Sequence, residues 1–396
     1  MTEGPTIAMR PEFELLLCCA MRSHRRGCKR LRTLLEQRLD WQCLVRLANH
    51  HGMMPHLYAR LSETCASFVP EAALTQLHEQ FTANARRNLL LTAKLLKLLA
   101  LFEEHQIAAV PFKGPLLALS AYGDSALRQF SDLDVLIHTE DVPKARELLI
   151  SHGYCPQFSL TREQETDLIR FRNEHAFWHE VEGVAVDLHW ALAPRWFQAT
   201  LDTENVWNRV ESTTVAGRIV ATLSAEDMLL FLCVHGSKHC WHLLSMIYDL
   251  AAHLRASTMV DWQRLIDQAD RQGSERMLLL GFHLASELFG VELPGELARK
   301  IKTDPSMDRL AAQVYRILLR DTDVAGGFFE EHLFNLRAIE YLRRKALYCF
   351  DQVLTPTPIE WASLPLPSSL SFLYYLVRPL RLVLKYKNGL PKPAFD

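Results

Sequence analysis

The segment RQFSDLDVLIHTED, residues 128–141, places two aspartates immediately before an apolar run. The run Val135–Ile137 predicts a buried strand, and side chains two positions apart on a strand point to the same face. Asp132 and Asp134 are therefore expected to project together, with Leu133 buried on the opposite side. Two carboxylates this close repel each other unless a positive charge lies between them. The fold of this chain is therefore expected to bring a cation to this strand.

A third acid lies in VAVDLHW, where apolar residues flank Asp187. HAFWHE and VAVDLHW predict two strands joined by the turn VEG, so Asp187 is expected on a strand near the acid pair. Mg²⁺, or Mn²⁺ in its place, takes oxygen ligands from carboxylates and substrate phosphates. Three acids on adjacent strands can hold two such ions. We therefore predict a metal site made by Asp132, Asp134 and Asp187; the alternative for the pair, capping of the following helix, suits Asp141 better.

His189 follows Asp187 by two positions and is expected on the same face of its strand. There it either orients a substrate or simply lies at the edge of the sheet. The sequence leaves both interpretations open.

The turn VPFKGP places Lys113 where an apolar strand ends and a helix begins. Such a turn exposes backbone N–H groups that suit a phosphate. Gly114 allows the backbone to approach a ligand closely, and Lys113 can neutralise phosphate charge. A lysine that reaches solvent at the end of a strand is the competing interpretation. The turn gains weight because it precedes the acid pair by one helix, while the motifs GxxxxGK[ST] and GxGxxG are missing.

The pattern of apolar residues changes twice along the 396 residues. Residues 11–105 have apolar side chains at three- and four-residue spacing, which predicts helices, and this period returns from SAEDMLLFLCVHG to near the end. Between these regions, short apolar runs separated by turns predict strands. We expect an α+β protein in which a small mixed β-sheet core at 104–222 is flanked by helical regions at 1–103 and 223–396.

Composition and charge argue against several classes of protein. Lysine plus arginine (44) nearly balance aspartate plus glutamate (46), and this net charge of −2 makes nucleic acid an unlikely partner. Nine cysteines at irregular spacing, without a CxxC pair, indicate reduced thiols and a cytoplasmic location. No stretch stays apolar for the ~20 residues of a membrane span. LSFLYYLVRPLRLVLKY near the C-terminus is expected to be a packed helix, with peripheral contact to a membrane as the alternative.

The segment HGSKHCWH carries three histidines, of which His235 and His239 share a helix face at i and i+4. Zinc binding is the sharper interpretation, but the HExxH pattern fails at Gly236, and a role in the wall of a binding site is preferred. Asp249, within SMIYDLAAHL, needs a partner if it is buried, and Lys238 or one of these histidines is expected to supply it. Structural pairing and contact with a ligand stay open as alternatives.

These motifs together resemble a known family. FKG, then a tyrosine and an arginine, then SDLDVLI and finally VDLHW are similar to the uncharacterised nucleotidyltransferase family of the DNA polymerase β-like superfamily. LANHHGMMPHLYARL and LFLCVHGSKHCWHLLSMIYDLA are similar to the flanking helical segments of that family, so the resemblance covers most of the chain. It implies a mixed sheet, a bound Mg²⁺–nucleoside triphosphate, and transfer of a nucleoside monophosphate to a hydroxyl or related group.

The resemblance also implies roles for particular residues. Asp132 and Asp134 would ligate metal, and Asp187 would be the third ligand or the general base for the acceptor. The residues that it assigns to nucleotide binding are Lys113, Gly114, Arg128, Ser131 and Lys238. The candidates left for contact with substrate are His189, His235, His239 and Asp249. The Lys-Gly-Pro turn departs from the Gly-Ser turn of small nucleotidyltransferases and is closer to that of the abortive-infection type.

The sequence does not identify the acceptor, which can be a small molecule, a sugar, a peptide or a protein. Two other functions compete with nucleotidyl transfer. Attack at the γ-phosphate on the same fold would make the chain a kinase, and a chain with little catalysis would be a nucleotide-binding or interaction module. The three intact acids argue against the second alternative.

Overall fold

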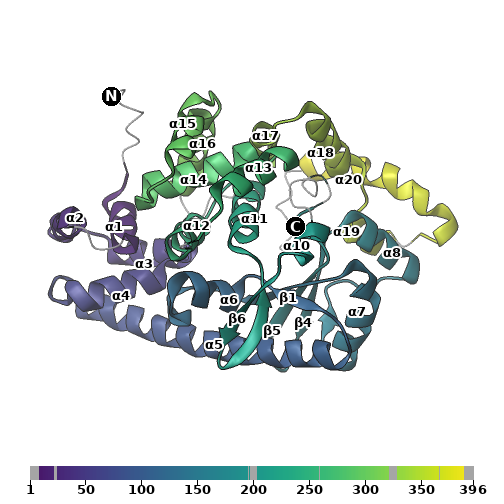
Figure 1. Ribbon diagram of the computed structural model, residues 1–396, viewed down its shortest axis with the longest axis horizontal. Helices are drawn as coiled ribbons and strands as arrows, with labels where there is room; N and C mark the ends of the chain where they lie inside the picture. Colours follow the sequence, from purple (N-terminus) through teal and green to yellow (C-terminus); the bar gives the residue numbers. More distant parts are fainter. Residues whose placement is uncertain are drawn as a thin grey trace.

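The computed structural model describes residues 9–21, 25–194, 196, 203–257, 259–320, 328–364 and 366–387. The N-terminal part is helical, as predicted, and its last helix is 34 residues long. The elements are α1 (Pro11–Ala20), α2 (Arg25–Leu35), α3 (Trp41–His50), α4 (Met54–Thr64), η1 (Ala66–Phe68) and α5 (Glu71–Glu104). Helix α5 is roughly 50 Å long at 1.5 Å per residue, and it runs beneath both the N-terminal helices and the sheet (Figure 1).

A five-stranded mixed sheet follows α5. Its strands are β1 (Ala109–Pro111), β2 (Asp132–Ile137), β3 (Cys155–Pro156), β4 (Glu174–His179) and β5 (Val184–His189). Their order is β1-β2-β5-β4-β3, in which β2 and β5 are parallel and the other neighbours are antiparallel. A separate hairpin is formed by β6 (Glu211–Val215) and β7 (Arg218–Thr222). The predicted α+β class with a small mixed sheet, including the β4–β5 hairpin, is confirmed.

Short helical segments connect the strands. Between β1 and β2 lie α6 (Gly114–Leu117), η2 (Ala118–Tyr122) and η3 (Ser125–Leu127). The later connections contain η4 (Thr139–Asp141), α7 (Val142–Ser151), α8 (Arg162–Phe171) and α10 (Thr203–Trp207). The helix predicted for PLLALSAYG is present, but it widens into a π-helical turn at Ala118 and ends at Gly123, whose φ is 76°.

The C-terminal part is helical again. Its elements are α11 (Ala225–Lys238), α12 (Leu244–Ala256), α13 (Trp262–Gln272), α14 (Glu275–Phe289), α15 (Gly295–Thr303), α16 (Met307–Leu318), α17 (Phe328–Ala338), α18 (Leu342–Leu354), α19 (Pro358–Ser363), η5 (Ser368–Leu373) and α20 (Tyr374–Lys387). Within the described ranges, no helix combines the length and the apolarity that crossing a bilayer requires.

The two faces of the sheet differ in character. On one face, Leu133, Val135 and Ile137 of β2 are at most 1% exposed and belong to a hydrophobic cluster with residues of α5 and α7. The other face carries the acids of β2 and β5 and is turned toward α11, where the ring of Phe231 contacts Phe112 at the end of β1. The face that carries the acids thus lies between the sheet and the C-terminal helices.

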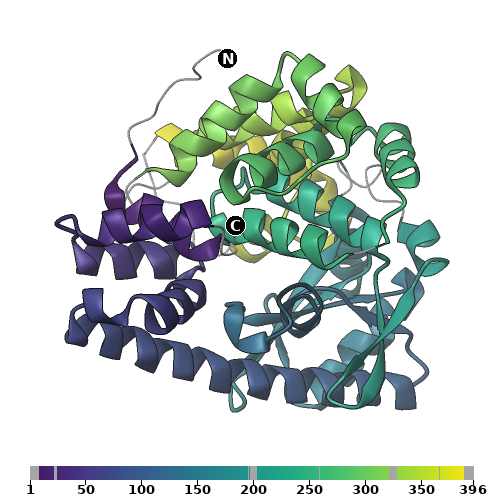
Figure 2. The same cartoon turned by 60° about the vertical axis from the view of Figure 1, so that its left-hand side comes forward.

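A second hydrophobic cluster joins helices from both ends of the chain. It contains residues of α1 to α5 together with residues of α11 to α16. Figures 1 and 2 both show the N-terminal helices packed beside the C-terminal ones above the long helix α5. Because the two helical parts share this core, the division at 1–103, 104–222 and 223–396 stays a prediction.

The end of α11 explains the glycine in HGSKHCWH. Cys240 has a positive φ of 54°, and the N–H groups of Cys240 and Trp241 donate to the carbonyls of Ser237 and Gly236, which is the Schellman ending of a helix. This turn folds the fully buried ring of Trp241 back onto Gly236. A Cβ at Gly236 would lie 2.4 Å from that ring.

We expect Gly236→Ala to destabilise the protein by about 2 kcal/mol or more, because the buried indole has no room to move away from the added methyl group. Urea unfolding measures the effect. Gly295→Ala is the matched control: a Cβ there meets nothing within 4 Å, so this change should be neutral or slightly stabilising. Equal stability of the two variants would contradict the packing argument.

Candidate functional site

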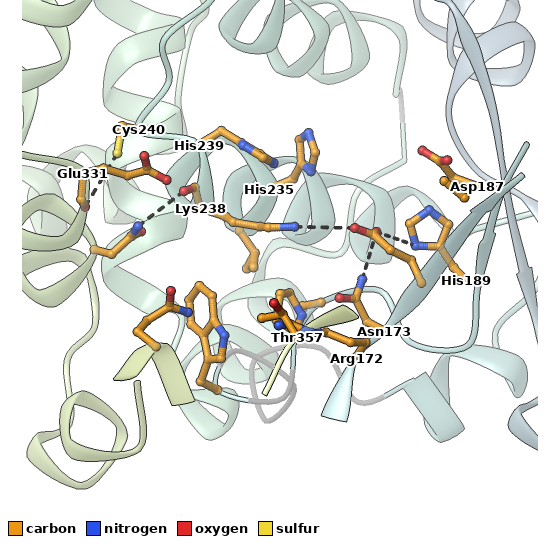
Figure 3. Close-up of a pocket in the computed structure, with 18 of the residues that line it drawn as sticks. Arg172, Asn173, Asp187, His189, His235, Lys238, His239, Cys240, Glu331 and Thr357 are labelled. Carbon is orange, nitrogen blue, oxygen red and sulfur yellow. Dashed lines mark hydrogen bonds and ion pairs between the residues drawn. The ribbon is translucent and has the colours of Figure 1, made fainter. Parts of the chain in front are cut away.

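A cavity of about 1060 Å³ lies over the face of the sheet that carries the acids. Its lining comes from the turn after β1, from β2, β4 and β5, from α11, and from α16 to α20. This volume is at the top of the range of about 300–1000 Å³ that is typical of small-molecule pockets. Figure 3 shows side chains from these elements directed toward a common space.

The three predicted carboxylates meet on one wall of this cavity. The parallel pairing of β2 and β5 sets Asp134 directly opposite Asp187, and Asp132 lies opposite Ala185 on the same face. Leu133, between the two aspartates, is buried on the other face, as alternation along a strand requires. The prediction that acids from two neighbouring strands share one face is confirmed, and their chemical roles stay predictions.

Asp134 is the most tightly held of these acids and is only 4% exposed. Lys113 Nζ donates to its Oδ1 at 3.2 Å, and His189 Nε2 donates to the same oxygen at 3.1 Å. Burial alone would raise the pKa of Asp134, but the charge of Lys113 and the hydrogen bond from His189 hold it well below its ordinary value. For Lys113, burial favours a lower pKa, and the charges of Asp134, Asp132 and Glu174 raise it above the ordinary value. Both groups are therefore charged at neutral pH.

The pKa values of Asp187 and Asp132 are both higher than those of ordinary aspartates. Burial, followed by the carboxylate of Asp134, raises the pKa of Asp187 to about 7, although His189 lowers it in part. Burial and Asp134 likewise raise the pKa of Asp132. Burial is the larger cause of both shifts and repulsion by Asp134 is the second, and a bound cation would favour the ionised form of both acids.

Among the described residues, one group brings three metal-ligating atoms together. It consists of Asp134, Asp187 and His189, whose ligand atoms lie within 4.8 Å of one another. His189 therefore lies on the face of Asp187, as predicted, and it takes the place in this closest group that the sequence assigned to Asp132. Asp132 lies on the same wall, two residues before Asp134 on β2, where it is opposite Ala185.

Glu174, at the start of β4, is a fourth acid of the wall that the sequence analysis missed. Its Oε2 lies 3.2 Å from His189 Nδ1 and accepts a hydrogen bond from the amide of Asn173 at 3.0 Å, and its Oε1 lies 3.9 Å from Lys238 Nζ. Burial would raise the pKa of Glu174, but Lys238, His189 and Lys113 lower it. His189 thus lies between two carboxylates, and although burial favours a lower pKa, the hydrogen bond to Asp134 and the charge of Glu174 raise it.

The signal for Glu174 was present in the sequence but incomplete. Glu174 directly precedes the predicted strand HAFWHE, whereas the observed β4 begins at Glu174 and its antiparallel register sets this residue opposite His189. Because side chains alternate along both strands, this register alone places Glu174 on the acid face. Knowledge of the register, which the sequence does not supply, was needed to find it.

Helix α11 supplies the next wall, with Lys238, His235 and His239 among its lining residues, as Figure 3 shows. The rings of His235 and His239 have centroids 4.7 Å apart. Burial and the nearby cation Lys113 hold the pKa of His235 well below its ordinary value, so this ring is neutral. The histidines of α11 are not part of the metal-ligating group found in the described residues; their role in the wall of a binding site stays a prediction.

Gly114 and Ser131 lie beside the cavity and are not among its lining residues. Gly114 has a positive φ of 52°, and a Cβ there would lie 3.1 Å from the carbonyl oxygen of Asp132. The glycine thus lets the turn after Lys113 pack against the strand of the acids. Ser131 is exposed, immediately before β2.

Arg128 and Asp249 pair with each other outside the cavity lining. The guanidinium of Arg128 makes two hydrogen bonds to the carboxylate of Asp249, at 2.8 and 2.9 Å, and the hydroxyl of Tyr122 donates to the same carboxylate. The expectation that Lys238 or a histidine would pair with Asp249 is wrong, because these residues are on the cavity side of the fold. The contact ties the segment before β2 to α12.

More than half of the chain is similar to a known protein family. A family model described as an uncharacterised nucleotidyltransferase matches residues 37–290. The chain belongs to this family. The match includes α3 to α14 and every strand of the sheet, so the acids, Lys113 and the residues of α11 all lie within the nucleotidyltransferase region. No curated protein matches the chain.

In this nucleotidyltransferase, Asp187→Asn is expected to stabilise the metal-free protein at pH 8. The pKa of Asp187 is raised in the folded state from 3.8 to about 7, so its contribution to stability is full below pH 4 and is lost as the pH rises through 7. Asparagine does not ionise. The free energy of unfolding of the variant minus that of wild type should therefore increase from pH 5 to pH 8, by on the order of 1–3 kcal/mol.

Urea unfolding in EDTA at a series of pH values measures this difference. Asp141→Asn is the control, because Asp141 follows β2, the strand next to that of Asp187, and is not among the cavity-lining residues. If the difference in the free energy of unfolding between Asp187→Asn and wild type does not change with pH, the pKa of Asp187 is not raised in the folded protein.

Proposed function

We propose that the chain is a Mg²⁺-dependent nucleotidyltransferase that moves a nucleoside monophosphate from a nucleoside triphosphate to an acceptor hydroxyl. The observation that carries the proposal is the meeting of Asp132, Asp134 and Asp187 on one cavity wall, beside Lys113. Membership of the family supports nucleotidyl transfer as the general class of reaction. The ion, the nucleotide and the acceptor are the proposed parts.

The donor atoms on the wall fit a hard divalent cation. Asp132, Asp134 and Asp187 offer carboxylate oxygens, which Mg²⁺ and Mn²⁺ prefer, and the raised pKa of Asp187 comes first from burial and then from the negative charge of Asp134. When bound, such an ion would offset charge on the triphosphate and acidify the acceptor hydroxyl. His189 would fix the orientation of the Asp134 carboxylate through its hydrogen bond of 3.1 Å.

Two lysines provide positive charge for the phosphates. Lys113 lies against Asp134 at 3.2 Å, and Lys238 lies 3.9 Å from Glu174, on the adjoining wall. Lysine binds phosphate as a mobile point charge, and each of these two can turn from its carboxylate toward a triphosphate. The cavity volume of about 1060 Å³ leaves space for an acceptor beside the nucleotide.

Asp187 is the residue best suited to receive the proton of the acceptor. A general base must lie within hydrogen-bond reach of the proton that it accepts, and Asp187 lines the cavity on β5, directly opposite Asp134 of β2. The acceptor oxygen would attack the α-phosphorus as its proton passes to Asp187. A new P–O bond forms while the bond to the bridging oxygen of pyrophosphate breaks, and pyrophosphate leaves.

The proposal predicts that Asp134→Asn reduces transfer by about 100-fold or more, since it removes a carboxylate that would hold the metal ion. The full chain is incubated with Mg²⁺ and either α- or γ-labelled ATP, with a small-molecule and peptide extract as the pool of acceptors. Label in the acceptor from α-labelled ATP, with labelled pyrophosphate from γ-labelled ATP, is the expected result. Asp132→Asn should also reduce transfer, and Asp141→Asn should not.

Three outcomes would contradict the proposal in different ways. Label that reaches the acceptor only from γ-labelled ATP would make the chain a kinase. Full activity of Asp134→Asn, in protein whose melting temperature matches wild type, would remove the assignment of the acids. If neither Mg²⁺ nor any nucleoside triphosphate raises the melting temperature, the chain is a binding or interaction module without this catalysis.

A further inference from the structure

One wall of the cavity lies outside the part of the chain that matches the family. The match ends at residue 290, yet α16 to α20 contribute to the lining. The acids of the proposed site all lie in the matched part. A wall supplied by the later helices is therefore where this chain can select its second substrate, and the charges on that wall indicate which kind of substrate fits.

Two arginines of α20 share a single carboxylate on this wall. Glu360 of α19 is completely buried, Arg378 Nη1 lies 3.4 Å from its Oε2, and Arg381 Nε pairs with its Oε1. Glu360 also accepts hydrogen bonds from the backbone N–H and the hydroxyl of Thr357, at 2.7 and 2.6 Å. Both oxygens of the Glu360 carboxylate therefore have partners already. Its single negative charge is shared by two guanidinium groups, which leaves a net positive charge.

Arg172 adds a third positive charge without adding a carboxylate. It follows α8 and lines the cavity with Arg378 and Arg381. Within the part of the chain that the structure describes, its guanidinium makes no ion pair or hydrogen bond. Burial and the charges of Arg172 and Arg381 lower the pKa of Arg378 in spite of Glu360, so Arg378 lies close enough to each of the other two to be repelled by it. We call Arg172, Arg378 and Arg381 the arginine cluster.

The arginine cluster lies beside the acids of the proposed site. Arg172 precedes Asn173 and Glu174 directly, and the amide of Asn173 donates to Glu174 at 3.0 Å. Two residues of extended chain span at most about 7 Å, so the backbone of Arg172 is within that distance of Glu174. Figure 3 shows Arg172 and Thr357 across the cavity from His235. An anion held by the cluster would therefore be in the same cavity as the reacting groups.

We propose that the arginine cluster binds an anionic group, a carboxylate or a phosphate, of the acceptor substrate. This inference rests on the proposed function and names the chemical class of its second substrate. Arginine presents a planar fork that matches the two oxygens of a carboxylate or phosphate, and Arg172 has its whole fork available. In the proposed function, Lys113 and Lys238 near the acids bind the triphosphate. The arginine cluster is therefore left to bind the second substrate.

Three probes that share a hydroxylated three-carbon skeleton test the inference: glycerol 3-phosphate, glycerate and glycerol. Each is titrated into the full chain at constant ionic strength, after saturation with Mg²⁺ and an ATP analogue that has a methylene group between its α- and β-phosphates. We expect glycerol 3-phosphate, glycerate or both to raise the melting temperature further, and glycerol to have no effect. The anion that works identifies the group that the cluster binds.

Arg172→Gln should weaken binding of the active anion at least about tenfold, because a charge-assisted contact is lost. Arg381→Gln is the second variant in case Arg172→Gln does not fold. Binding of the ATP analogue should be unchanged in both. Arg320→Gln is the matched control, because it removes the same charge from another part of the lining, where Arg320 pairs with Glu330.

The result that overturns the inference is the absence of any added stabilisation by either anion while the ATP analogue still binds; the proposed function then stands without it. An equal loss in Arg320→Gln would show a nonspecific charge effect and would also overturn it. Weaker binding of the ATP analogue to Arg172→Gln would assign the cluster to the triphosphate instead. If the analogue does not bind wild type at all, the proposed function fails, and the inference fails with it.

Discussion

The parallel pairing of β2 with β5 is the constraint on which the cavity depends. It sets Asp134 opposite Asp187 and turns both toward the same side of the sheet. A slip of one residue would move Leu133 to the cavity side and place its neighbouring aspartates among the apolar side chains of α5 and α7. The hydrophobic core behind the sheet therefore holds the acids together against their mutual repulsion.

Positive charge around these acids is distributed unevenly. Lys113 and His189 balance Asp134, and Lys238 with His189 balances Glu174, whereas Asp187 has no ion pair among the described residues and its pKa is raised by burial and by Asp134. A bound cation would therefore offset the negative charge of Asp187. The arginine cluster, made by Arg172 after α8 and two arginines of α20, carries the opposite excess. A cavity with unpaired charge of both signs is suited to a metal–triphosphate and an anionic second substrate.

The C-terminal helices complete the hydrophobic core and also line the cavity. Residues of α11 to α16 complete the hydrophobic core that the N-terminal helices begin. Helices α17 to α20 then extend past the family match and close one side of the cavity. The proposed chemistry lies with the sheet and α11, and the proposed selection of the acceptor lies with α20 and Arg172.

The sequence by itself determined the features that depend on local periodicity. Strand alternation predicted the shared face of Asp132 and Asp134, and turn residues predicted the β4–β5 hairpin. The tertiary structure alone decided the place of Glu174, which needs the strand register, and the pairing of Arg128 with Asp249, 121 residues away. Such contacts are set by how complete elements pack, and packing is a property of the whole core rather than of any short segment.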